Sequence, residues 1–152
     1  MMGSFEEMNV DVSALSLPNA YDEIVNITDF KGKVVVLAGG GQGTIEESKK
    51  WGGALSEACA EEDELQYYGV GFLKGLPAFV PKLMVKSNVK NGPPSMLDWD
   101  GKGAEILGLT RPDMMHIYLV DKMGILRWRL IASYSRDALN SVLEQAKLLA
   151  QE

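Results

Sequence analysis

The sequence predicts one α/β domain with a mixed central sheet, an N-terminal β-hairpin and helices on both faces. Two observations predict it. Residues 29–47 read DFKGKVVVLAGGGQGTIEE, a polar lead-in followed by an apolar β-branched run, a glycine loop and the start of a helix. Beyond them, segments with strand periodicity and with helical periodicity continue to alternate, with no internal repeat and no break in composition.

The N-terminal part of the chain predicts a flexible leader and then a short hairpin. Residues 1–10 (MMGSFEEMNV) are expected to be flexible, and Met1–Ser4 resemble part of an expression tag. The single domain is expected to occupy residues 11–152. In Asp11–Thr28, apolar and polar positions alternate around the turn signal Pro18-Asn19, which predicts the hairpin.

A β-α-β unit is predicted around the glycine loop. Val34–Ala38 (VVVLA) is typical of a strand buried on both faces. Thr44 and Glu47 have the spacing of a capping box, so a helix should begin at Thr44. This helix would end at the acidic run Glu61–Glu64, before a parallel strand over Gln66–Leu73. Its apolar face would contain Ile45, Trp51, Leu55, Ala58 and Cys59.

The second half of the chain predicts a short helix, a strand-helix pair, a hairpin and a closing helix. Pro77 suits the first position of a helix, because its missing N–H is not needed there. Pro81 would keep that helix short or kinked. Its apolar stripe would contain Phe79, Val80, Leu83 and Met84. The remaining expected elements are strand Met96–Trp99, helix Ala104–Leu107, hairpin strands His116–Val120 and Ile125–Ile131, and helix Arg136–Ala150.

The composition excludes several classes of function. The 152 residues carry 15 basic and 21 acidic side chains, a net charge of −6, whereas general nucleic-acid binding needs a basic surface. No apolar run reaches the ~18 residues of a membrane span, and the N-terminus lacks the regions of a signal peptide. A single cysteine cannot form an internal disulfide, so a cytoplasmic location is expected.

Three segments resemble the redoxin branch of the thioredoxin-like superfamily, which includes AhpC/TSA-type peroxiredoxins and ResA/TlpA-like proteins. LPNAYDEIVNITDFKGKVVVL (17–37) is similar to the family's first hairpin and core strand. PSMLDWDGKGAEILGL (94–109) is similar to its strand, turn and short helix, and HIYLVDKMGILRWRL (116–130) to its late hairpin. The three occur in the family's order and cover most of the chain, so the resemblance implies a thioredoxin-like fold.

The family's redox chemistry does not carry over to these residues. Aligned on GKVVVL, the attacking cysteine of the redoxins falls near Thr44 and the resolving cysteine near Glu47. A threonine hydroxyl is a poor nucleophile without a dedicated base. The arginine that peroxiredoxins place before the late hairpin is replaced by Asp113-Met114-Met115, and Pro112 lies too early for the thioredoxin cis-proline. The resemblance therefore implies a redox-inactive relative.

Cys59 is the sole candidate for thiol chemistry. Its spacing with Trp51 and Leu55 places it on the apolar face of the first helix, and the acidic run beyond it would raise the pKa of the thiol. Because free cysteine is commonly a small buried hydrophobic residue, core packing is favoured over a redox role.

Gly40, Gly41, Gln42, Gly43 and Thr44 are the candidate ligand-binding residues. Glycines before a helix leave backbone N–H groups that can hold an anion. However, the loop has no P-loop lysine, it misses GxGxxG at the last position, and the acidic residues that follow would repel phosphate. A tight turn is favoured over a phosphate site, and the turn remains the candidate ligand site because redoxins bind substrate there.

Lys74, Lys82, Lys86 and Lys90 are the candidate partner-binding residues. No acidic residue occurs from Leu65 to Leu97, so that segment carries +4, whereas the rest of the chain, with 11 basic and 21 acidic residues, carries −10. Docking to an acidic partner is favoured over a lipid anchor, because the apolar stripe is short and interrupted by proline. An ordinary solvated face fits these observations equally well.

The only histidine, His116, is expected to be structural. Asp98, Asp100 and Asp121 are expected to be turn residues rather than metal ligands. Neither a metal nor another cofactor is therefore expected.

The sequence favours a thioredoxin-like domain without the catalytic cysteines, acting as a non-redox binding or assembly module. IYLVDKMGILRW also looks like the late hairpin of the mitochondrial ATP-synthase assembly factor family, which uses a thioredoxin-like domain as a chaperone. The alternatives are a thiol-dependent oxidoreductase or peroxidase working through Cys59, and a ligand-binding or enzymatic site at Gly39–Thr44. The sequence leaves the partner, the ligand and the oligomeric state open.

Overall fold

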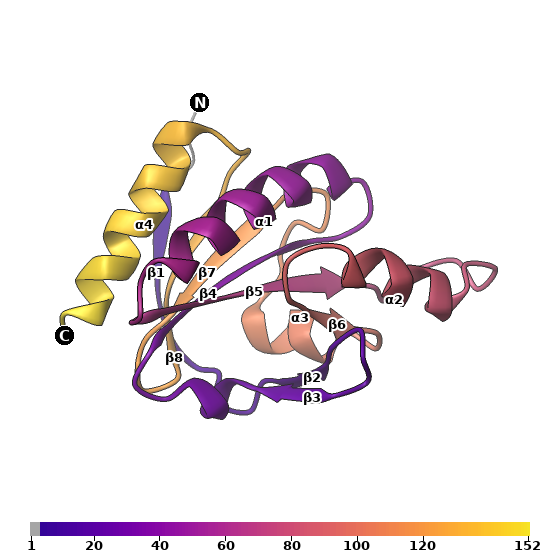
Figure 1. Cartoon of the computed structure of the whole chain (residues 1–152), viewed down its shortest axis with the longest axis horizontal. Helices are drawn as coiled ribbons and strands as arrows, with labels where there is room; N and C mark the ends of the chain where they lie inside the picture. Colours follow the sequence, from indigo (N-terminus) through magenta and orange to yellow (C-terminus); the bar gives the residue numbers. More distant parts are fainter. Residues whose placement is uncertain (1–3) are drawn as a thin grey trace.

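Six strands form the central sheet of the protein, whose computed structural model describes residues 4–152. The strands are β1 (Phe5–Asp11), β4 (Val34–Gly40), β5 (Leu65–Phe72), β6 (Ser95–Asp98), β7 (His116–Val120) and β8 (Ile125–Ile131). Their order across the sheet is β1-β8-β7-β4-β5-β6 (Figure 1). Two further strands, β2 (Ser16–Pro18) and β3 (Ile24–Asn26), pair separately as an antiparallel hairpin. Of the residues interpreted as a tag, Met1–Gly3 lie outside the described residues.

Strand β4 lies inside the sheet because its sequence is apolar on both faces. It pairs in parallel with β5 and antiparallel with β7. Val34 and Val36 belong to one core, and Val35 and Leu37 belong to the core on the opposite face. This is the arrangement expected of a strand that is buried on both sides.

Helices α1 (Ile45–Ala60) and α4 (Arg136–Ala150) cover one face of the sheet, where they contact each other (Figure 1). Trp51, Leu55 and Val142 fill the core beneath them. The opposite face is covered by the β2–β3 hairpin, a 3₁₀ turn (Ile27–Phe30) and α3 (Lys102–Leu107). The expected mixed sheet, hairpin and helices on both faces are therefore confirmed.

Helix α2 (Lys82–Lys90) belongs to neither layer. It follows β5 and projects beyond the sheet at the right of Figure 1, and none of its residues is buried. None of the helices within residues 4–152 combines the length and the apolar character needed to cross a membrane.

Residues 5–10 form part of a strand, so the expectation of a flexible leader is wrong for them. In β1, Phe5 lies opposite Leu130 of β8. The guanidinium of Arg129 donates to Glu6 Oε2 at 2.7 Å and to the Gly108 carbonyl at 2.7 Å, which fixes β1 to the sheet and to the end of α3. Because β1 is a polar edge strand, it lacks the apolar run that predicts a buried strand.

The capping box predicted for α1 is absent, although α1 does begin directly after Thr44. The Thr44 hydroxyl instead donates to the Gly41 carbonyl at 2.6 Å. Glu47 Oε1 accepts from the backbone N–H of Tyr134 at 2.5 Å, which joins α1 to the segment that leads into α4. A tertiary partner has therefore replaced the local one.

The helix expected from Pro77 begins only at Lys82. A residue that precedes proline is disfavoured in the helical region, so Val80 cannot readily continue a helix into Pro81. Pro81 itself is extended (φ −68°, ψ 134°) and caps α2. The two prolines thus divide this segment into a loop and a nine-residue helix.

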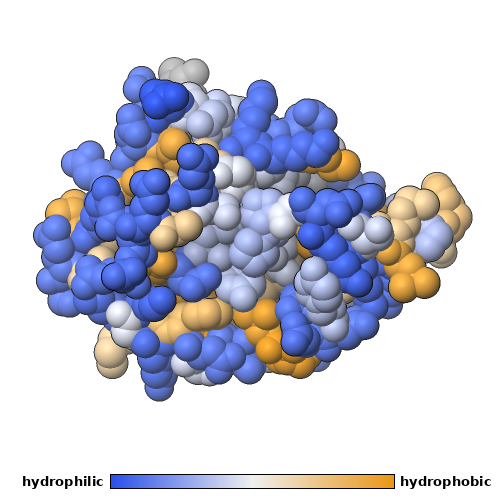
Figure 2. Space-filling view, viewed as in Figure 1, coloured by the Kyte–Doolittle hydropathy of each residue, from blue (hydrophilic) through white to orange (hydrophobic). Residues whose placement is uncertain are grey.

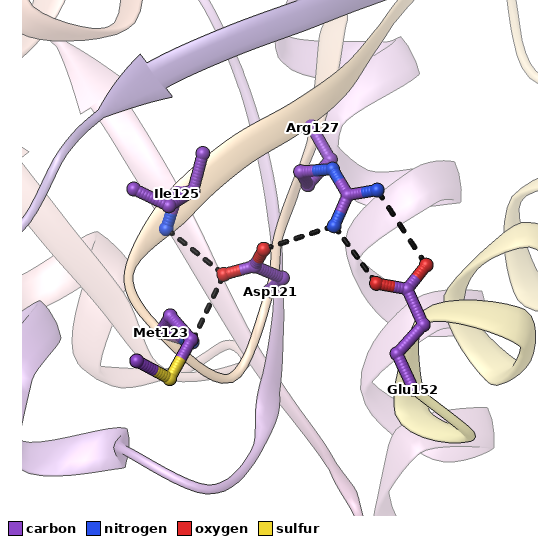
Figure 3. A network of polar contacts seen from close by, with 5 residues as sticks. All are labelled: Asp121, Met123, Ile125, Arg127 and Glu152. Carbon is purple, nitrogen blue, oxygen red and sulfur yellow. Dashed lines mark hydrogen bonds and ion pairs between the residues drawn. The ribbon is translucent and has the colours of Figure 1, made fainter.

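The turn between β7 and β8 is held by Asp121 (Figure 3). Its Oδ1 accepts from the backbone N–H groups of Met123 (2.9 Å) and Ile125 (3.0 Å). Its Oδ2 accepts from Arg127, whose guanidinium also pairs with Glu152 at 2.9 Å. Asp121 is therefore a turn residue, as predicted, and the network ties the residues that follow α4 to the hairpin.

Candidate functional site

The turn between β4 and α1 is closed by backbone contacts. The Thr44 N–H donates to the Gly41 carbonyl at 3.3 Å, and the Gly41 N–H donates to the Pro112 carbonyl at 2.8 Å. Gly43 adopts a positive φ of 88°, which favours glycine. No peptide bond in residues 4–152 is cis, so Pro112 faces this turn as a trans proline.

Glycine is required here because other chain segments approach closely. A side-chain carbon at Gly41 would lie 2.7 Å from the Pro112 carbonyl oxygen. At Gly40, it would meet the Thr44 hydroxyl at 2.7 Å. Close packing therefore accounts for these two glycines, in agreement with the interpretation of a tight turn.

A pocket of about 690 Å³ opens beside this turn. Of the five candidate ligand-binding residues, Gly41 and Gln42 line it. Gly40, Gly43 and Thr44 do not, and the Thr44 side chain is buried. The sequence therefore located one wall of the pocket but not its extent.

The other walls come from segments distant in the sequence. The apolar lining contains Phe72, Ala104, Leu109 and Pro112. Gln42 Nε2 donates to the Gly75 carbonyl at 3.1 Å, which joins the turn to the loop after β5. No local motif signals this pocket, because its walls meet only after the sheet has formed.

Charge in the pocket is mainly acidic. Glu105 and Asp113 are exposed lining residues. The buried Asp98 carboxylate accepts from the backbone N–H groups of Gly103 (2.9 Å) and Ala104 (2.8 Å), so it anchors the start of α3. Lys74 is the basic lining residue. Such a lining suits an apolar group that carries a positive charge better than it suits a phosphate.

Cys59 lies far from this turn, in the last turn of α1. It follows Thr44 by fifteen helical positions, a rise of roughly 22 Å. The side chain is only 3% exposed. Burial, with a smaller contribution from Glu62, raises the pKa of the thiol to about 11. Cys59 thus occupies the core position that its spacing predicts.

The four candidate lysines do not form one exposed basic face. Lys74 lines the pocket. Lys86 Nζ pairs with Asp22 at 2.7 Å and its side chain is 19% exposed. Lys82 and Lys90 lie over the rings of Trp99 (5.0 Å) and Tyr21 (4.8 Å), respectively. The three lysines of α2 therefore contact the body of the domain.

His116 is buried and holds the segment that carries Pro112. Its Nδ1–H donates to the Met114 carbonyl at 3.0 Å, so Nε2 is free to accept from the Arg111 backbone N–H at 3.4 Å. Burial lowers the pKa of the imidazole, and Arg129 lowers it further, while the Met114 carbonyl acts in the opposite direction. The structural role predicted for His116 agrees with these contacts.

Lowering the pH from 7 to 5.5 should destabilise the protein through His116. The unfolded chain takes up a proton near pH 6.5, whereas the native state holds the imidazole neutral to lower pH. The unfolded state then binds more protons, so the free energy of unfolding falls as the pH drops below about 6.5. Urea unfolding at several pH values measures this slope. His116→Gln should flatten it; an unchanged slope in that variant would assign the effect to other groups.

Solved structures similar to this chain share its fold. One is described as a putative thiol:disulfide interchange protein DsbE from Chlorobium tepidum, with a TM-score of 0.70 and 19% identity over 98% of this chain and 100% of that one. A secreted thiol-disulfide isomerase from Corynebacterium glutamicum has a TM-score of 0.71 and 18% identity over 100% and 93% of the two chains. The protein therefore has a thioredoxin-like fold.

A third similar structure, described as a DsbF homologue from Corynebacterium diphtheriae, has a TM-score of 0.70 and 20% identity over 95% of this chain and 93% of that one. No family model and no curated protein matches the sequence. Within residues 4–152, no three His, Cys, Asp or Glu side chains are grouped so that they could hold a metal ion.

Proposed function

We propose that this protein is a non-redox, thioredoxin-like binding module that holds a segment of a partner protein in the pocket beside the β4–α1 turn. The observation that carries the proposal is the state of that turn. It has no thiol where the redoxins that the sequence resembles carry one, yet Gly41 and Gln42 open onto a pocket of about 690 Å³. These two features support a site that binds a ligand without thiol chemistry at the turn.

The chemistry of the pocket supports a ligand of a particular kind. Phe72, Leu109 and Pro112 offer apolar contact, and Glu105 and Asp113 supply negative charge at exposed positions. A large apolar side chain with a neighbouring lysine or arginine would satisfy both. We therefore propose an apolar-basic peptide segment as the ligand class, in a cytoplasmic setting.

The test has two parts, a redox assay and a binding assay. In the redox assay, the protein should reduce neither insulin disulfides nor hydroperoxides faster than a thiol blank does, because the turn has no thiolate. Cys59 should react slowly with a thiol reagent until the protein is denatured. Turnover that disappears in Cys59→Ser would contradict the proposal.

In the binding assay, a displayed random-peptide library is selected on the wild-type protein. The enriched peptides should combine a large apolar residue with lysine or arginine. Glu105→Lys and Asp113→Lys should each weaken their binding by about tenfold, since charge at a binding site contributes on this scale. Glu57→Lys, an exposed charge reversal on α1 outside the pocket, is the matched control. Equal losses of peptide affinity in all three variants would argue against this pocket as the binding site.

The second candidate is a thiol-disulfide oxidoreductase that works through Cys59, which the descriptions of the similar structures favour. It would require the last turn of α1 to open, because Cys59 is buried and its thiol is protonated at neutral pH. The redox assay distinguishes this candidate from the binding module.

A further inference from the structure

The segment Leu76–Lys90, called the arm below, presents an apolar surface to solvent. Phe79, Leu83 and Met84 are 85%, 78% and 55% exposed. Apolar colour marks the end of the molecule at which α2 lies in Figure 1 (Figure 2). Exposed apolar residues that occur singly need no explanation, whereas three within six positions of one projecting segment mark an interaction surface.

The orientation of α2 explains why Leu83 and Met84 face outward. Lys82, Lys86 and Lys90 are spaced at four-residue intervals, so they share one helix face. That face contacts the body, through Trp99, Asp22 and Tyr21. The same inward side carries Val85 and Val89, which with Lys86 are the half-buried residues of α2, so apolar side chains lie on both sides of this helix.

The outward side of α2 carries no charge. Leu83 and Met84 lie there together with Ser87 and Asn88, all four of them exposed. Lys86 is held by Asp22, whereas Lys82 and Lys90 remain exposed at the edge of the outward side. The surface left for a partner is therefore apolar, with positive charge at its margin. This is the class of segment that the pocket is proposed to take.

The arm and the pocket lie next to each other in one chain. Lys74 and Gly75 line the pocket, and the arm begins at the next residue. The contacts of α2 with Tyr21, Asp22 and Trp99 hold the arm against the body and leave its exposed apolar residues facing outward. Two copies related by a two-fold axis could each place the arm on the other's pocket, which closes the assembly.

We infer that the occupant of the pocket includes the arm of a second copy of this chain, so that the protein forms a reciprocal homodimer. The apolar residues of each arm contact Phe72, Leu109 and Pro112 of the other copy. Charge favours this pairing, because Lys82 and Lys90 stay exposed at the margin of the arm, whereas Glu105 and Asp113 are exposed in the pocket. The inference rests on the proposed function, since it uses the same pocket.

Sedimentation of the full chain over a dilution series tests the inference. The wild-type protein should dissociate from dimer to monomer with a dissociation constant of about 1–100 μM, typical of a small interface. Phe79→Asp should raise this constant by about thirtyfold or more, as expected for a buried anchor. Met123→Asp places the same charge at another highly exposed apolar residue, in the β7–β8 turn, and it should leave the constant unchanged.

A second set of variants tests the pocket side of the contact. Ala104→Trp fills the pocket and should weaken the dimer as strongly as Phe79→Asp does. Because Ala104 is half-buried, Glu105→Lys at the exposed position beside it provides the same test without a change in packing. Equimolar Phe79→Asp and Ala104→Trp should form a heterodimer, since one intact arm then meets one intact pocket.

Three outcomes would overturn the inference. The first is a wild-type protein that stays monomeric up to about 1 mM. The second is a dimer that is sensitive to Phe79→Asp but not to either pocket variant, which would indicate direct α2–α2 packing. The third is a monomer that floats with phosphatidylglycerol vesicles through Phe79, which would make the arm a lipid contact. In the first case, capture of a peptide by the monomer would leave the proposed function standing. Redox turnover would contradict the proposed function while leaving these measurements valid.

Discussion

Gly39→Val should destabilise the native state by more than about 3 kcal/mol, because the added carbon atoms would overlap backbone that cannot move. A Cβ at this position would collide with the Val70 carbonyl oxygen and would lie 2.8 Å from Cε2 of Phe72. Gly39 is paired with Val70 between β4 and β5, so relief would require these strands to separate. Phe72 also lines the pocket, so binding should be lost together with stability.

Urea unfolding monitored by circular dichroism measures this effect. Gly53→Ala is the matched control, because a Cβ at Gly53 meets nothing within 4 Å on the exposed side of α1. Alanine in a helix interior should stabilise the protein by about 0.5–1 kcal/mol. If Gly39→Val unfolds at the same urea concentration as the wild type, the close approach of β4 and β5 at this turn is not tight.

Trp51→Ala should cost about 3–5 kcal/mol, the range for truncating a large buried aromatic side chain. Trp51 is completely buried in the core between α1, α4 and the sheet. Its ring meets Tyr134 edge to face at 5.3 Å, and its Nε1–H donates to the Ala132 carbonyl at 3.3 Å. The variant therefore leaves both a cavity and a buried carbonyl without its donor.

The comparison that isolates the packing contribution is Trp51→Phe, which should cost less because a ring still reaches Tyr134. Phe79→Ala serves as the exposed control and should change the free energy of unfolding by no more than about 0.5 kcal/mol. A loss below about 1 kcal/mol for Trp51→Ala would mean that the core collapses onto the vacated space.

The sequence predicts the central elements well, because their patterns depend on a single burial environment. Val34–Ala38 is apolar at every position and becomes the inner strand β4. Leu139, Val142 and Ala146 recur at helical spacing and pack onto the sheet within α4, whose observed bounds equal the predicted ones. In both elements, local periodicity and tertiary packing require the same residues.

The sequence predicts poorly where a side chain can choose between a local and a distant partner. Glu47 has the spacing of a capping box but accepts from Tyr134, far along the chain. The apolar residues of the arm have the spacing of a core stripe, yet Leu83 faces solvent. The orientation of the arm depends on Tyr21, Asp22 and Trp99, whose approach no local pattern indicates.

The pairing of β1 with β8 has a consequence for the order in which the chain acquires its structure. Phe5 of β1 lies opposite Leu130 of β8, although the two residues are far apart in the sequence. Contacts between such distant positions must overcome a large loop-closure entropy, and they slow folding relative to local ones. During translation, β1 must therefore wait, with its β8-facing edge unpaired, until β8 has left the ribosome.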